Sequence, residues 1–72
     1  LAEVFDKVVA KVNGDIITLS AVEERKSILV NQIRANGGKV ELSDRELTRE
    51  VLNTIIDEKL QVQEAKKLSL KV

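Results

Sequence analysis

The chain has 72 residues, 12 of them basic and 12 acidic, so its formal net charge is zero. This length allows at most one small domain, and interspersed charges argue against a nucleic-acid partner, which normally requires a basic face. The absence of Cys leaves the redox compartment undetermined. No apolar run approaches the length of a membrane span, so we expect no membrane insertion, and no signal-peptide pattern is present. A chain that begins at Leu1 rather than Met is typical of a processed protein or an excised piece.

The first predicted element is a β-hairpin, preceded by a mixed lead-in in which Val4 and Phe5 are candidate anchors. Asn13-Gly14 lies between two β-rich runs, residues 8–12 and 16–18. Both turn residues tolerate the positive φ of a type I′ turn, which predicts two short antiparallel strands.

The hairpin leads directly into a predicted helix over residues 21–36. Ser20 followed three residues later by Glu23 is the pattern of a capping box, and Glu23 and Glu24 would lie in the first turn, as the helix dipole prefers. Gly37 is expected to end this helix in the left-handed conformation. The helix is amphipathic on one side, and its apolar face carries Val22, Leu29 and Ile33.

A second capping box, Ser43 and Glu46, predicts a longer helix over residues 44–68. This helix is apolar over most of its circumference. Its first apolar face consists of Leu47, Val51, Ile55, Val62 and Ala65, and its second of Leu52, Ile56 and Leu60. After it, residues 68–72 alternate between apolar and polar, which predicts an extended tail available to pair with the hairpin.

The two predicted helices differ in length by about nine residues, or about 13 Å at the helical rise. The last turns of the second helix, with Val62, Ala65 and Leu68, therefore overhang any antiparallel partner. Exposed apolar surface of this size marks an interaction site. Three explanations stay open: self-association, excision from a larger protein, or binding of apolar segments of other proteins.

No catalytic constellation can be assembled from the sequence. Without His or Cys, the usual general base, thiolate nucleophile and soft metal ligands are missing. Ser20 and Ser43 are interpreted as helix caps, and adjacent carboxylates such as Asp57-Glu58 diverge by about 100° on a helix. We therefore expect neither enzymatic activity nor a metal or cofactor.

Two stretches resemble the N-terminal region of SurA-like periplasmic chaperones, a group that includes the parvulin-linked foldases of the bacterial envelope. Residues 6–20, DKVVAKVNGDIITLS, follow the pattern D-x-[IV]-[VA]-A-x-V-N-[GN]. Residues 51–68, VLNTIIDEKLQVQEAKKL, follow the pattern L-I-x-[DE]-x-[IL]-x-x-Q-x-[AG]. The resemblance implies a single small domain over residues 1–72, mainly α-helical, which is part of a SurA-like N-terminal chaperone domain.

Two departures from the family accompany this resemblance. Ser69 stands where the family usually has Gly, which removes a left-handed cap and predicts that the chain takes another path there. Family members continue past the position of Val72 into further helices, often followed by parvulin-type prolyl isomerase domains. The isomerase activity is therefore not carried over to this chain.

The resemblance implies ATP-independent binding of unfolded outer-membrane or other envelope polypeptides, rich in aromatic residues, in the periplasm. The residues that we predict to contact such clients are Val22, Leu29, Ile33, Leu52, Ile56 and Leu60. Each of them is equally a candidate for the internal core. The alternative is a structural or assembly module whose apolar faces are covered in a homodimer, with the second helix or the tail exchanged between copies.

Overall fold

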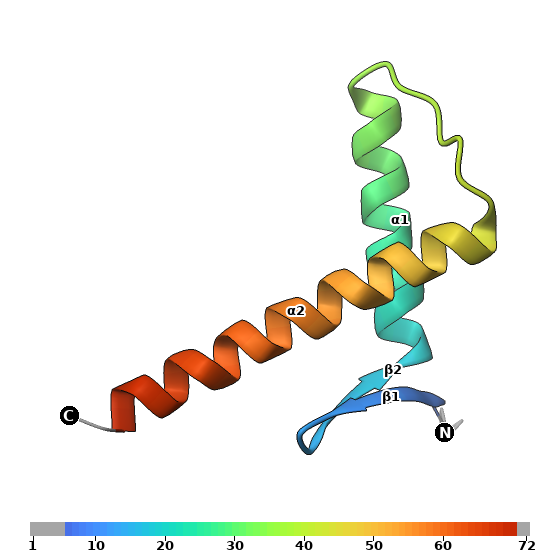
Figure 1. Ribbon diagram of the computed structural model, residues 1–72. Coiled ribbons are helices and arrows are strands. Elements are labelled where there is room, and N and C mark those ends of the chain that lie inside the picture. Colours follow the sequence, from blue (N-terminus) through green and yellow to red (C-terminus); the bar gives the residue numbers. More distant parts are fainter. Residues whose placement is uncertain (1–5, 71–72) are drawn as a thin grey trace, which may run out of the picture.

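The structure, a computed structural model that describes residues 6–70, contains a β-hairpin followed by two helices (Figure 1). The elements in chain order are β1 (Val8–Val12), β2 (Asp15–Thr18), α1 (Leu19–Ala35) and α2 (Asp44–Leu70). α1 rises from the hairpin, and α2 crosses α1 and runs on past it (Figure 1). The predicted class, mainly α with a short hairpin and a long second helix, is confirmed. The candidate anchors Val4 and Phe5 lie outside the described residues.

The hairpin closes through the predicted two-residue turn. Asn13 has a φ of 50° and Gly14 a φ of 96°, as a type I′ turn requires at both central positions. Asp15 pairs with Val12, so β2 begins one residue earlier than predicted, and the register shifts between Val8 and Ala10. Such a bulge increases the local twist of the strand.

α1 begins two residues earlier than predicted because Thr18, not Ser20, is its N-cap. The Thr18 side chain accepts a hydrogen bond from the backbone N–H of Ala21 at 3.3 Å. The predicted Ser20–Glu23 capping box is therefore wrong: Ser20 lies inside the first turn, and that turn contains no acidic residue.

The negative charge at the start of α1 comes instead from Asp6, in the segment before the hairpin. The Ser20 backbone N–H donates to Asp6 Oδ1 at 3.2 Å, and the Ser20 hydroxyl donates to Asp6 Oδ2. The hydroxyl hydrogen bond lowers the pKa of Asp6. A carboxylate at this end of the helix is favoured by the helix dipole. The first predicted cap thus failed because a carboxylate distant in sequence reaches the helix end.

The predicted stop of α1 at Gly37 and the predicted start of α2 after Ser43 are confirmed. Gly37 has a φ of 79° and donates its N–H to the Arg34 carbonyl at 3.0 Å, while Gly38 donates to the Ile33 carbonyl at 2.9 Å. These two bonds are the Schellman pattern. At the start of α2, the Glu46 N–H donates to Ser43 Oγ at 3.2 Å, and the Ser43 hydroxyl donates to Glu46 Oε1 at 3.1 Å. The first bond is the N-cap half of the predicted capping box, and the Glu46 carboxylate returns to the Ser43 hydroxyl in place of the Ser43 backbone N–H.

The predicted extended tail is wrong for residues 68–70, which continue α2 as helix to Leu70. Ser69 has a side chain that disfavours the left-handed cap, so nothing ends the helix at Leu68. Lys67 in the last turn also favours helix at this end, because a cation interacts well with the dipole there. Residues 71–72 lie outside the described part of the chain.

The core is small and is built from all the elements. Its buried side chains come from the hairpin, α1 and α2: Val12, Ile17, Val22, Leu47 and Val51. Lys26 is buried beside them at 7 % exposure, and its Nζ reaches Asp44 Oδ1 at 2.7 Å. The hydrogen bond to Asp44 raises the pKa of Lys26. The aliphatic stem of Lys26 thus extends the core while its ammonium group ties α1 to the start of α2.

Leu47→Ala should lower the free energy of unfolding by about 2–5 kcal/mol, because Leu47 is only 5 % exposed and its truncation leaves a cavity. Leu68→Ala is the matched control: Leu68 is 62 % exposed, and the change should stay within about 0.5 kcal/mol. Urea unfolding followed by circular dichroism at 222 nm measures both. Equal effects of the two substitutions would contradict this description of the core.

Candidate functional site

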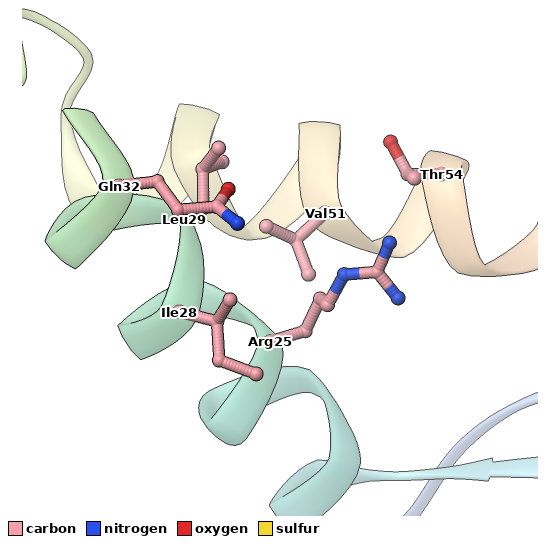
Figure 2. Close-up of a pocket in the computed structure, with 6 residues that line it drawn as sticks. All are labelled: Arg25, Ile28, Leu29, Gln32, Val51 and Thr54. Carbon is pink, nitrogen blue, oxygen red and sulfur yellow. The ribbon is translucent and has the colours of Figure 1, made fainter. Parts of the chain in front are cut away.

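The candidate site begins with a cavity of about 370 Å³ where α1 and α2 cross. Figure 2 shows Val51 descending from α2 toward the side chains of α1, and Arg25 reaching from α1 toward α2. The lining residues are Arg25, Ile28, Leu29, Gln32, Val51 and Thr54. Half of the lining residues are aliphatic, namely Ile28, Leu29 and Val51, and the other half carry polar groups.

Two further cavities continue the first along α2. The second, of about 340 Å³, shares Arg25 and Ile28 with the first and passes beside β2. The third, of about 370 Å³, shares Ile55, Glu58 and Lys59 with the second. Because neighbouring cavities share lining residues, they lie next to one another in a row along α2, and we call this row the α2 groove. It ends at Asp15, Val62 and Lys66.

The α2 groove exposes large aliphatic side chains. Ile16 is 51 % exposed, Ile28 45 % and Val62 54 %. They come from β2, α1 and α2 respectively, so only the tertiary fold brings them to one surface. An apolar surface assembled in this way marks an interaction site.

An ion pair crosses the α2 groove between the two helices. Arg25 Nη1 donates to Glu58 Oε1 at 2.9 Å, and Arg25 Nη2 donates to Glu58 Oε2 at 2.6 Å. The hydrogen bonds from Arg25 lower the pKa of Glu58 below its ordinary value of 4.5, and they raise the pKa of Arg25. This bidentate geometry fixes both side chains and joins α1 to α2.

The outer edge of β2 borders the α2 groove. Ile16 and Ile17 point to opposite faces of the hairpin, yet both line the second cavity together with Thr18, so this cavity follows the strand edge. In a two-residue hairpin the pair that closes the turn is of the hydrogen-bonded kind. The next pair, Lys11 and Ile16, therefore directs the backbone N–H and C=O of Ile16 outward, toward this edge.

The predicted client-contacting residues lie in different environments in the structure. Leu29 alone lines the α2 groove. Val22 is 1 % exposed and belongs to the core, so its side chain is not accessible in this fold. Leu52 and Ile56 pack half-buried against the core, whereas Leu60 is 42 % exposed.

Sequence reasoning missed most of the groove, including Ile16 and Ile28. Ile55 and Val62 belong to the first apolar face of the second helix, which the sequence predicted correctly as a face but did not assign to the site. To assign one apolar face of the second helix to the core and the other to the surface, one must know which face the hairpin and α1 cover. This depends on the tertiary structure.

Gln63 was also missed, and it connects the two stretches that resemble the SurA-like family. Its Nε2 donates to the Val12 carbonyl at 2.8 Å and to Asp15 Oδ2 at 2.9 Å. Its Oε1 accepts from Asn13 Nδ2 at 3.1 Å. A signal was present in the sequence, because both family patterns include these polar residues: Asn13 in the first and Gln63 in the second.

Two features are absent from residues 6–70. No three His, Cys, Asp or Glu side chains gather there in a way that could hold a metal ion. In the same part of the chain, neither helix has the length and apolar character that crossing a bilayer requires.

The comparisons with known proteins show the family. Residues 2–72 match the SurA-like N-terminal domain family, and the chain belongs to it. Among known proteins, Chaperone SurA of Burkholderia lata is 35% identical over 65 residues, as is Chaperone SurA of Burkholderia orbicola. These alignments cover 90% of this chain but 14% of each relative, so the chain spans a small part of their length. No solved structure matches the chain significantly.

The Arg25–Glu58 pair predicts a specific pH dependence of stability. Because the pKa of Glu58 is lowered in the folded state, the pair stabilises the fold above about pH 4.5. This contribution is lost as the pH falls through the lowered folded-state pKa of Glu58, so stability should decline as the pH falls below about 4.5.

Glu58→Gln and Arg25→Gln should each make this decline shallower, because either change removes the same pair. Urea unfolding at several pH values measures the slope. A slope that neither substitution changes would show that the pair contributes nothing to the acid sensitivity.

Proposed function

We propose that the chain is a chaperone-like module that binds unfolded polypeptides in the α2 groove without ATP. At the level of the family, a chaperone role is supported by membership of the SurA-like N-terminal domain family and by relatives named Chaperone SurA. The observation that carries the proposal is the α2 groove, a row of cavities with exposed aliphatic side chains, which suits an extended chain. We further propose that the clients are outer-membrane or other envelope polypeptides and that the protein works in the periplasm.

The chemistry of the groove favours many clients over one. The exposed aliphatic side chains accept different apolar groups, each weakly, and charged side chains beside them, such as Lys59 and Lys66, can meet polar parts of a client. The outward-directed backbone groups of Ile16 add donors and acceptors that every polypeptide can use, whatever its sequence. Together these features give affinity without strict selection, which a chaperone for unfolded chains requires.

We assign the main client contacts to Ile16, Ile28, Leu29 and Val62, which line the groove. A second apolar surface consists of Leu60 with the half-buried Leu52 and Ile56, and the half-buried Ile33 lies on α1. We propose this second surface as a weaker contact, because most of its area is already packed against the core.

We propose no catalytic role for the chain, and no cofactor. The prolyl isomerase activity of some relatives belongs to separate domains, so it is not transferred here. The expected activity is binding alone, with suppression of client aggregation as its consequence.

The second candidate function is assembly through a homodimer, and the free end of α2 favours it. Val62 is 54 % exposed, Leu68 62 % and Leu70 85 %. A second copy could cover these side chains, either by packing or by exchanging the end of α2. Sedimentation equilibrium combined with an aggregation assay separates the functions. A tight dimer that leaves client aggregation unchanged supports assembly, and a monomer that suppresses aggregation supports client binding.

Ile28→Ser should weaken binding of a fluorescein-labelled, aromatic-rich unfolded peptide by about fivefold or more, because the substitution places a polar group in the groove wall. Leu42→Ser is the matched control. Leu42 is 44 % exposed against 45 % for Ile28, and it lines none of the cavities of the groove.

Fluorescence anisotropy measures the affinity, and circular dichroism first shows that both variants are folded. Loss of affinity in both variants, or in neither, would contradict the assignment of the α2 groove as the binding site.

A further inference from the structure

We propose that Gln63 is a positioning residue that holds the tip of the β-hairpin against α2 and thereby sets the width of the α2 groove. The hairpin tip is defined as residues 12–15. This inference rests on the proposed function in one respect only, namely that the α2 groove binds a client polypeptide. The attachment of the tip to α2 can be measured without any client.

One amide group makes the side-chain hydrogen bonds between α2 and the tip, next to the packing of Val12 in the core. The two N–H groups of Gln63 Nε2 are matched by two acceptors, the Val12 carbonyl at 2.8 Å and the Asp15 carboxylate at 2.9 Å. Gln63 Oε1 accepts from the Asn13 side chain at 3.1 Å. The side chain thus contacts three of the four tip residues across a separation of about 50 residues in the sequence. An amide suits this position because it both donates and accepts.

The base of the hairpin is attached to a different helix. β2 ends at Thr18 and continues directly into α1, and the Leu19 N–H donates to the Lys7 carbonyl at 2.7 Å. The Asp6–Ser20 hydrogen bonds add to this attachment at the base. The hairpin is therefore fastened to α1 at one end and to α2 at the other. Without the Gln63 hydrogen bonds, the packing of Val12 in the core still holds the hairpin, but Asn13 and Asp15 lose their side-chain contact with α2.

The position of the tip decides the shape of the groove. Asp15 forms one wall of the third cavity, opposite Val62 and Lys66 of α2. The following β2 residues form one wall of the second cavity, opposite Ile55, Glu58 and Lys59. Since Gln63 bonds Asp15 directly, a change at Gln63 displaces one wall relative to the other. Client affinity should then change although no client-contacting side chain has been altered.

The test compares Gln63→Ala and Gln63→Glu with the control Gln61→Ala, a change at an exposed position two residues away on the same helix. The first variant removes all three hydrogen bonds. The second keeps the size but loses both donors and sets a carboxylate against Asp15 and the Val12 carbonyl. Adding Asp15→Asn to Gln63→Glu restores a donor to this contact and should rescue it.

Two readouts are needed. Backbone amide hydrogen exchange by NMR should accelerate about fivefold or more at Val12 and Asp15 in both Gln63 variants, because this pair closes the turn and its backbone hydrogen bonds should open more often once the tip is released from α2. Exchange at the core residues Val22 and Val51 should stay unchanged. Affinity for the labelled peptide should fall about fivefold or more in the Gln63 variants and be recovered in the double variant.

The outcomes test two claims: that Gln63 holds the hairpin tip against α2, and that it thereby sets the width of the α2 groove. Unchanged exchange at the hairpin tip, or equal effects of Gln61→Ala, overturns the positioning role. Accelerated exchange with unchanged peptide affinity overturns the control of groove width. Accelerated exchange in a protein whose unaltered form binds no peptide supports the attachment through Gln63 but overturns the proposed function. Rescue by the double variant supports a specific contact over a general loss of packing.

Discussion

The crossing of α1 and α2 over five buried aliphatic side chains is the contact on which the rest of the structure depends. Val22 of α1 meets Leu47 and Val51 of α2 there, and the hairpin completes the cluster with Val12 and Ile17. A chain of this size buries little apolar area, so each of these side chains contributes a large part of the stability. With so small a core, polar contacts between elements matter for position as much as for stability.

Those polar contacts occur at the ends of the core and have different roles. Lys26–Asp44 ties α1 to the start of α2, Arg25–Glu58 crosses the groove, and Gln63 reaches the hairpin tip. Exposed ion pairs contribute little to stability. The geometric role of these contacts is to join elements: Arg25–Glu58 connects two residues that line the α2 groove, and Gln63 bonds Asp15, which lines its end.

The local elements were predictable because their signals are local. The Asn13-Gly14 turn, the Gly37 helix end and the Ser43 N-cap were predicted from short patterns and are confirmed. The first cap was predicted wrongly for the opposite reason. Thr18 and Asp6 both accept hydrogen bonds from backbone N–H groups in the first turn of α1, and the hairpin is what brings Asp6 close to that turn. The predicted extended tail was wrong for a related reason. No residue or packing partner ends α2 at Leu68, so the helix continues to Leu70.

The sequence by itself determined the order of elements, the two turn-forming glycines, the uncovered end of the second helix and the family resemblance. These follow from backbone preferences and apolar periodicity, which act within a few residues. Only the tertiary structure decided which apolar side chains became core and which became surface. Val22 is buried, whereas Ile28 on the same helix is exposed. The difference depends on where α2 and the hairpin pack against α1, and this packing is set by contacts between residues far apart in the chain.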